Sequence, residues 1–280
     1  LKIMNHIKLP VLIICILLSV HTRAQINRCG TALTDNQRAF ELGMTDSVTD
    51  VFEINRTLHV SLFVVKDAAG ETNMDMSDFN IAFSGLNHAF DRIKLVFRIL
   101  SVRYIDNYHF DILRKKENES DMVIQNAISN TINVYLVSQL YDGNNQEVCG
   151  YTYFPAEKKD VIILSKACVA EEFLIEQFGH FFNLYHTHET GFAEELANGT
   201  NCVTAGDLCC DTPADPDLAG KVTPDCQYAS LVQDANNDYY TPSVLNYMSY
   251  GPGDCNKCYF TDEQYVRVLN CMLITKSHLW

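Results

Sequence analysis

The sequence predicts an α+β fold, in which a mixed sheet carries helices and is followed by an irregular, cysteine-rich part that ends in a helix. Two observations lead to this prediction. Between Leu58 and Leu164, apolar stretches typical of strands alternate with stretches that have helical spacing. After His186 the composition changes to loops with Cys, Gly, Pro and Asp, until a last helical pattern begins at Thr261.

Residues 1–24 have the pattern of a secretory signal peptide. Lys8 gives a basic start, Leu9–Val20 is apolar, and Thr22-Arg23-Ala24 is a small-x-small cleavage site. We expect Met4 to be the initiator and cleavage to occur before Gln25. The apolar run is too short to span a bilayer, and no later stretch is long enough for a membrane span. A secreted, extracellular protein is therefore expected.

The composition narrows the classes of partner and the redox compartment. The net charge of -14 argues against nucleic acid and against anionic membranes. Of 11 cysteines, Cys15 falls in the signal peptide, which leaves an even ten in the mature chain. After an export signal, an even number indicates disulfides, although their connectivity does not follow from the sequence. Besides Cys29, the candidates are Cys149, Cys168, Cys202, Cys209, Cys210, Cys226, Cys255, Cys258 and Cys271.

Residues 25–55 form a polar N-terminal segment, interpreted as a candidate pro-segment, with a weak helical pattern over Gln37–Leu42. Cys29 lies close to the expected mature start. Its thiolate could bind a zinc ion and keep a precursor inactive, or the residue could be one half of a disulfide. Both interpretations of Cys29 are open from the sequence.

The main domain is expected over residues 56–280. Strands are predicted at Leu58–Lys66, Leu95–Val102, Ile132–Ser138, Tyr151–Phe154 and Val161–Leu164. Apolar residues at helical spacing from Phe79 to Ile93 predict a helix with Ser77 as its N-cap, and a short helix is expected near Asp121–Ile128. Thr261 and Gln264 form a capping-box pattern at the start of the last helix.

The stretch Glu176–His186, E-Q-F-G-H-F-F-N-L-Y-H, follows the frame of the zinc-protease signature H-E-x-x-H-x-x-G-x-x-H. Glu176 and His180 are four residues apart and share one helix face. His186 must return from beyond a turn, where Asn183 tolerates the left-handed conformation that ends a helix sharply. One carboxylate and two imidazoles predict a zinc site, weaker than a site of three histidines.

The general-base position of the signature holds Gln177. A neutral amide cannot take a proton from a metal-bound water, so the sequence predicts weak or absent peptidase activity. Three other interpretations are open. The stretch could be an ordinary buried helix with incidental histidines, the site of an active Glu-His-His endopeptidase with another base, or part of a metal-free structural module.

The loop Asn201–Leu218 contains a group of oxygen donors at Asp207, Asp211, Thr212 and Asp215. Such a group is typical of a structural calcium site. The more frequent alternative is that these aspartates accept hydrogen bonds from backbone amides in turns.

Three separated blocks carry a resemblance to a known family: G-H-F-F-N-L-Y-H-T-H-E, G-D-L-C-C-D-T-P-A-D-P, and N-Y-M-S-Y followed by F-T-D-E-Q-Y. In these blocks the chain resembles the pappalysin (cytophagalysin) family of secreted metzincin zinc metallopeptidases. The resemblance extends from about Leu58 to the C-terminus. It implies an upper subdomain with a twisted, mostly parallel sheet and two helices, and an irregular, disulfide-stapled lower subdomain that ends in a helix.

The same resemblance implies roles for single residues. His180 and His186 match the second and third zinc ligands, and Glu176 stands at the position of the first. Met248 would form the apolar floor of the Met-turn below the metal. Tyr250 would reach the zinc or a substrate oxygen. The cleft between the subdomains would receive a protein or peptide ligand.

We predict that the secreted protein begins at Gln25, because the cleavage site ends at Ala24. N-terminal sequencing and intact mass of the exported protein check this prediction. Replacing Ala24 by Trp should block or shift cleavage, because the small-residue position is lost. Export with the apolar run still attached would contradict the prediction.

Overall fold

The computed structural model describes residues 27–252 and 255–280, so the predicted signal peptide lies outside the described residues. The described helices are α1 (Asp35–Gly43), α2 (Met76–Ala89), α3 (Glu119–Asn126), α4 (Glu171–Phe181) and α5 (Asp262–Ile274). The main sheet contains β1 (Asn27–Cys29), β2 (Arg56–Val65), β3 (Leu95–Ile105), β5 (Ile132–Val137), β7 (Val148–Thr152) and β8 (Val161–Ser165). A second sheet pairs β4 (Ile112–Arg114) with β6 (Gln139–Tyr141).

The main sheet is mixed, as predicted, with the strand order β1-β7-β8-β5-β2-β3. All neighbouring pairs are parallel except β7 and β8, which run antiparallel. The central strands β5 and β8 are buried along their whole length. Their continuous apolar sequences follow from this position, because both faces of the sheet are covered.

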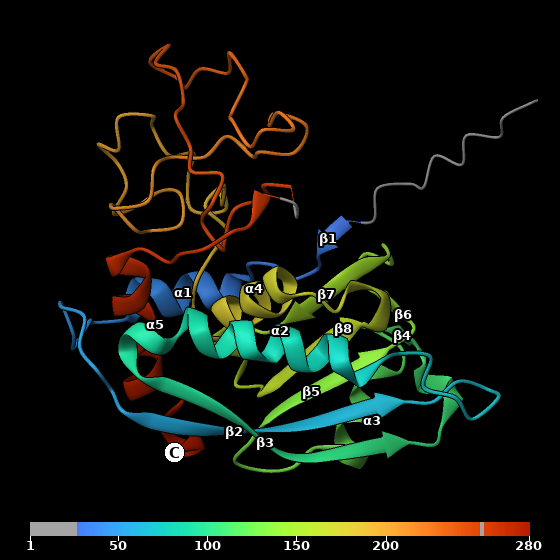
Figure 1. Cartoon of the computed structure of the whole chain (residues 1–280). Coiled ribbons are helices and arrows are strands. Elements are labelled where there is room, and N and C mark those ends of the chain that lie inside the picture. The colour runs from blue at the N-terminus through green and yellow to red at the C-terminus, as the bar shows by residue number, and fades with distance from the viewer. Residues whose placement is uncertain (1–26, 253–254) are drawn as a thin grey trace, which may run out of the picture.

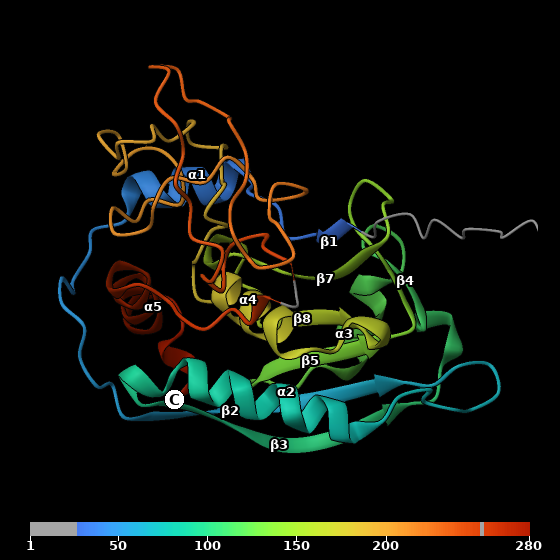
Figure 2. The ribbon, with the colours of Figure 1, turned by 45° about the horizontal axis from the view of Figure 1, so that its top comes forward.

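Helices cover the two faces of the sheet, which separates two of the three hydrophobic clusters of the described residues. On one face α2 and α4 pack through Phe79, Leu86 and Phe178 against the sheet, and residues of α5 join the same cluster. On the other face Met122 of α3 packs with Tyr135. Figure 1 and Figure 2 show α2 and α4 lying over the sheet and the loop-rich part gathered beside α1 and α4. This arrangement places α4 between the sheet and the loops.

Most predicted elements are confirmed, with shifted ends. The N-cap of α2 is Asp75 and not Ser77, because the Asp75 carboxylate accepts a hydrogen bond from the Ser77 backbone N–H. The strand predicted at Tyr151–Phe154 starts earlier, at Val148, and ends before the short 3₁₀ turn Pro155–Glu157. The capping box at Thr261 is present. The three-residue strands β1, β4 and β6 are not predicted from the sequence.

The segment from Phe182 to Thr261 contains no described α-helix and is crosslinked by Cys202–Cys210 and Cys226–Cys255, while Cys149–Cys168 lies in the sheet part. Six of the ten cysteines after the predicted signal peptide form disulfides, as expected for most of them, but the candidates Cys209, Cys258 and Cys271 are free thiols. Cys29, which the sequence leaves open, is a free thiol as well. Cys209 and Cys271 are each 1% exposed and fill the core as small apolar side chains. In the part of the chain that the structure describes, no helix has the length and apolarity to cross a membrane.

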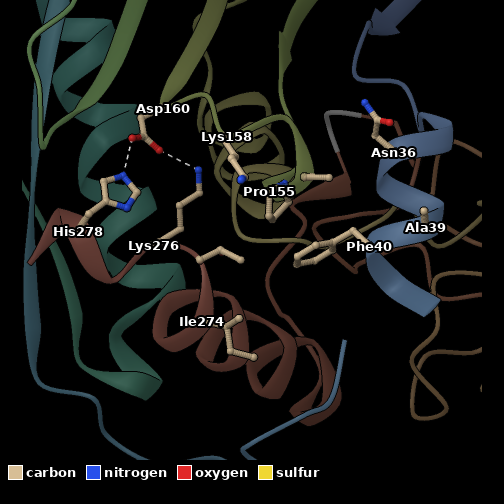
Figure 3. A pocket seen from close by; sticks show the side chains of 11 residues that line it. Asn36, Ala39, Phe40, Pro155, Lys158, Asp160, Ile274, Lys276 and His278 are labelled. Carbon is tan, nitrogen blue, oxygen red and sulfur yellow. Dashed lines mark hydrogen bonds and ion pairs between the residues drawn. The ribbon is translucent and has the colours of Figure 1, made fainter. Parts of the chain in front are cut away.

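The N-terminal segment packs tightly on the rest of the domain. Gln37 of α1 is fully buried and donates to the Asn183 side-chain oxygen at 2.8 Å and to the Tyr185 hydroxyl at 2.7 Å. Glu41 forms a 2.7 Å ion pair with Arg267 of α5. Figure 3 shows the neighbouring α1 residues facing α5 across a cavity of about 670 Å³. Helix α1 is thus part of the folded domain.

We predict that Glu41→Ala lowers the free energy of unfolding by about 3 kcal/mol, because it leaves the Arg267 guanidinium buried without its counter-charge. Chemical denaturation measures the change. Arg38→Ala on the same helix is the control, because Arg38 forms only a 3.8 Å pair with the exposed Asp35. That variant should stay within about 0.5 kcal/mol of the parent. Equal effects of the two substitutions would show that the buried pair is not special.

Candidate metal centre

The ligand positions of the predicted zinc motif meet because α4 stops abruptly. Glu176 and His180 lie one turn apart on α4 and are 1% and 0% exposed. Asn183 then adopts φ of 74°, the left-handed conformation that the sequence predicts for it. The Leu184 backbone N–H donates back to the Gly179 carbonyl at 2.9 Å. The reversed chain brings His186 over the helix.

Four donor atoms converge at this point. His180 Nε2 and His186 Nε2 are 3.0 Å apart, and Glu176 Oε1 lies 3.4 Å from His186 Nε2 and 3.9 Å from His180 Nε2. The fourth donor comes from β1, where Cys29 Sγ lies 3.5 Å from His180 Nε2. All four ligand atoms lie within 4.8 Å of one another, and among residues 27–252 and 255–280 this is the one such group found.

The spacing and the chemistry of the four donors fit a zinc ion. Zinc in proteins is tetrahedral, with bonds of about 2.0–2.3 Å to N, O and S, which places its ligands about 3.3–3.8 Å from one another. Four of the six distances between the donor atoms, from 3.0 to 3.9 Å, bracket this range. Two imidazoles, a carboxylate and a thiolate are all zinc ligands. The four residues therefore suit a zinc ion.

The protonation states of Glu176 and His180 also suit a cation. Burial disfavours the charged form of His186, but its hydrogen bonds with Cys29 and Glu176 raise its pKa. His180 Nδ1 lies 2.8 Å from the Leu184 carbonyl and must donate to it, so Nε2 carries the lone pair toward the group. Burial lowers the pKa of His180. Burial alone would raise the pKa of Glu176, but the hydrogen bond from His186 and the nearby positive charges lower it to about 2. An ionised Glu176 and a neutral His180 are the forms that bind metal.

Met248 and Tyr250 lie beside this group. Met248 is fully buried, and a Cβ added to Gly179 would sit 2.5 Å from its sulfur, so the helix and the methionine are in direct contact. Its backbone N–H donates to the Asn246 side chain. The Tyr250 ring is 4.7 Å from the His186 ring. Both residues thus lie near the donor group.

Gln177 contacts the N-terminal segment. Its side chain is 1% exposed, its amide nitrogen donates to Cys29 Sγ at 3.3 Å, and its amide oxygen accepts from the Thr31 hydroxyl at 3.2 Å. Of the two alternatives for Cys29, the structure has the free thiol. The sequence indicates that Cys29 could bind a metal, but it does not predict the contact between Cys29 and Gln177.

The predicted calcium donors do not converge in this way. Asp207 accepts from the Cys209 backbone N–H and the Thr212 hydroxyl, as in an ordinary turn. Asp211 accepts from the Glu263 backbone N–H, at the start of α5, and Asp215 from the Thr187 hydroxyl. The calcium prediction therefore receives no support, and the turn-capping alternative describes these contacts.

One buried carboxylate near the metal centre has no signal in the sequence. Glu195 and Asp215 line a cavity of about 300 Å³ that also borders His188. Glu195 Oε1, Asp207 Oδ2 and Asp215 Oδ1 are buried without a hydrogen-bond partner. Burial raises the pKa of Glu195 to about 8, of Asp207 to about 7 and of Asp215 to about 6. Glu195 stands at no motif spacing, so only the fold brings it here.

Comparison with known proteins supports the fold. The mature mirolysin of Tannerella forsythia, in complex with a cleaved peptide, superposes with a TM-score of 0.56 at 14% identity, covering 80% of this chain and 94% of that chain. Metalloproteinase-II from Bacteroides fragilis gives a TM-score of 0.42 at 10% identity, over 79% of this chain and 54% of that one. No family model matches the chain, and no curated protein matches its sequence. The likeness to mature mirolysin thus supports a metzincin-like α+β fold.

The raised carboxyl pKa values predict a pH dependence of stability. Carboxyl groups of the unfolded chain titrate near pH 4, whereas these three titrate at about 6 to 8 when folded. Between these limits the folded state holds more protons, so the free energy of unfolding should fall as the pH rises from about 4 to 8.

Asp207→Asn should flatten this decrease, because the amide carries no charge to bury. Denaturation is measured across the pH range in a chelator, so that no cation neutralises the carboxylates. Asp238→Asn, on the exposed surface, is the control and should keep the parent slope. A parent protein whose stability does not fall over this range contradicts the prediction.

Proposed function

We propose that this chain is a secreted, zinc-binding pseudoprotease of the pappalysin type, which keeps the metallopeptidase fold and does not hydrolyse peptides. The observation that carries the proposal is the contact between Gln177 and Cys29 inside the donor group. Gln177 stands at the general-base position, and the Cys29 sulfur lies beside His180 and His186.

A zinc peptidase has two requirements at this place. It keeps one coordination position open for water or substrate, and it needs a carboxylate to take the proton of that water. Here the sulfur of Cys29 stands within bonding reach of the shared centre, and Gln177 cannot ionise. The site therefore has neither an open coordination position nor a carboxylate base, and the two residues responsible are in contact.

Glu176, His180 and His186 would hold the zinc ion, with Cys29 as a fourth ligand from the N-terminal segment. A bound zinc ion supplies a positive charge that polarises its ligands. Two anionic ligands, Glu176 and Cys29, offset that charge, so this set favours holding the ion over activating a water. The zinc centre would then stabilise the fold by tying the N-terminal segment to α4.

A protein or peptide remains the class of partner that we propose. The superposed mirolysin structure contains a cleaved peptide, which is a property of that protein. In this chain β1 pairs with β7 at the edge of the sheet next to α4. A peptide that binds along β7 has to displace β1 first, so binding there should be weak in the intact chain.

We predict that the purified protein carries zinc and does not cleave a broad peptide library. The triple variant Cys29→Ala, Glu176→His, Gln177→Glu should gain cleavage that a chelator abolishes, because it restores three neutral ligands, an open position and a base. Gln177→Glu alone should restore little. A general base contributes about 10²–10⁴-fold, which sets the scale of the gain over the same variant with Gln177 retained.

The control is the triple variant with His186→Ala added, which should lose both metal and activity. If the unaltered protein already cleaves peptides at the rates of ordinary proteases, the active-endopeptidase alternative holds. If it binds no zinc even after incubation with the ion, the metal-free structural module holds. Metal analysis and the cleavage assay separate the three.

A further inference from the structure

We propose that Gln177 is a positioning residue for the Cys29 sulfur, so that the glutamine at the general-base position builds a closed Cys-Glu-His-His zinc site instead of a latch that opens. This inference rests on the proposed zinc binding and goes beyond it. At the position where a protease has its general base, Gln177 would instead hold a metal ligand in place. The inference rests on the chain of hydrogen bonds that runs from Thr31 through Gln177 to Cys29.

The orientation of the Gln177 amide follows from its neighbours. The Thr31 hydroxyl accepts a hydrogen bond from the Thr152 backbone N–H at 3.0 Å, so its own proton is free to point at Gln177. It donates that proton to the Gln177 amide oxygen at 3.2 Å. The amide nitrogen is thereby turned toward Cys29 Sγ, 3.3 Å away.

The sulfur receives a second donor from the backbone. The Thr31 N–H points at Cys29 Sγ at 3.4 Å, so two N–H groups meet the same sulfur atom. These two hydrogen bonds fix the position of the Cys29 sulfur beside the two histidines. Deprotonation on metal binding releases the thiol proton to solvent. Residues of β1 and α4 thus form one ligand shell.

The charge balance explains why glutamine suits this position better than glutamate. The site is buried, with Cys29 7%, Glu176 1% and Gln177 1% exposed. A divalent cation with one thiolate and one carboxylate is neutral, whereas a glutamate at 177 would add an unpaired negative charge. It would also lose the N–H donor and face the sulfur with an oxygen. The substitutions at 176 and 177 therefore suit a site that includes Cys29.

The packing of the N-terminal segment supports a closed site. Besides Cys29, the segment is held by the Gly30 N–H to the Gly150 carbonyl at 2.8 Å and by the Thr34 hydroxyl to Glu157 at 2.8 Å. The Gln37 side-chain oxygen accepts from the Ala156 N–H. Figure 1 and Figure 2 show β1 beside β7. Several independent contacts would have to break before the sulfur could leave.

The test compares Gln177→Glu with Gln139→Glu, which adds the same charge at an exposed position of β6. Both are made in the full mature chain with Cys258→Ser, because Cys258 is the exposed free thiol among the described residues. Cobalt(II) replaces zinc as the spectroscopic probe. The parent and Gln139→Glu should show a thiolate-to-cobalt charge-transfer band and a Cys29 that resists alkylation under native conditions.

Gln177→Glu should weaken zinc affinity by about 10–100-fold, the usual effect of losing a partner of a metal ligand. It should also diminish the charge-transfer band and expose Cys29 to alkylation, as located by peptide mass mapping. Gln177→Met, which lacks the donor but adds no charge, should give a smaller change in the same direction. The circular dichroism spectrum of each variant shows whether it is folded. An effect of the added charge alone would appear in Gln139→Glu as well as in Gln177→Glu.

The outcomes separate this inference from the proposed function. If the parent binds one metal ion but shows no charge-transfer band, zinc binding stands and the closed site is wrong. If the band and the protection of Cys29 persist in Gln177→Glu, Cys29 is a ligand but Gln177 does not position it. If the parent binds no metal at all, the proposed function fails as well.

Discussion

The left-handed turn at Asn183 is the constraint on which the centre depends. Its φ of 74° ends α4 and sends the chain back, so that His186 meets His180. Asn183 also forms hydrogen bonds through its backbone carbonyl and through both polar atoms of its side chain. Its carbonyl accepts from Arg267 of α5, its side-chain oxygen accepts from Gln37, and its side-chain nitrogen donates to Glu41 of α1. One residue in a strained conformation thus joins three helices, and the network holds the strain in place.

The local signals in the sequence predict α4 and the elements around it well. The i, i+4 spacing of Glu176 and His180, the turn residue Asn183 and the capping box at Thr261 each follow from short-range geometry. The long strands follow from continuous apolar runs. These features depend on neighbours within a few residues, so a single sequence carries them. The mixed sheet and the metzincin-like fold follow from their order along the chain.

What the sequence does not predict depends on contacts between distant residues. The strand β1 has three residues and becomes a strand only by pairing with β7. The contact between Cys29 and His180 spans 151 positions, and no spacing rule reaches that far. The free thiols have the same cause, because an even count cannot show that Cys209 and Cys271 are packed as core residues. Glu195 is buried by the loops around it and not by its own surroundings in the sequence.

The separation in sequence between the N-terminal segment and the residues that it contacts also affects the order of folding. The earliest residues of the mature chain contact strands and helices that emerge last, including Arg267 of α5, which lies 226 positions after Glu41. Closing loops of this length costs entropy that only the assembled sheet can offset. The centre should therefore be completed late, after nearly the whole chain has been synthesised. During that interval Cys29 is an unburied thiol, which can form wrong disulfides with other cysteines until its own place has formed.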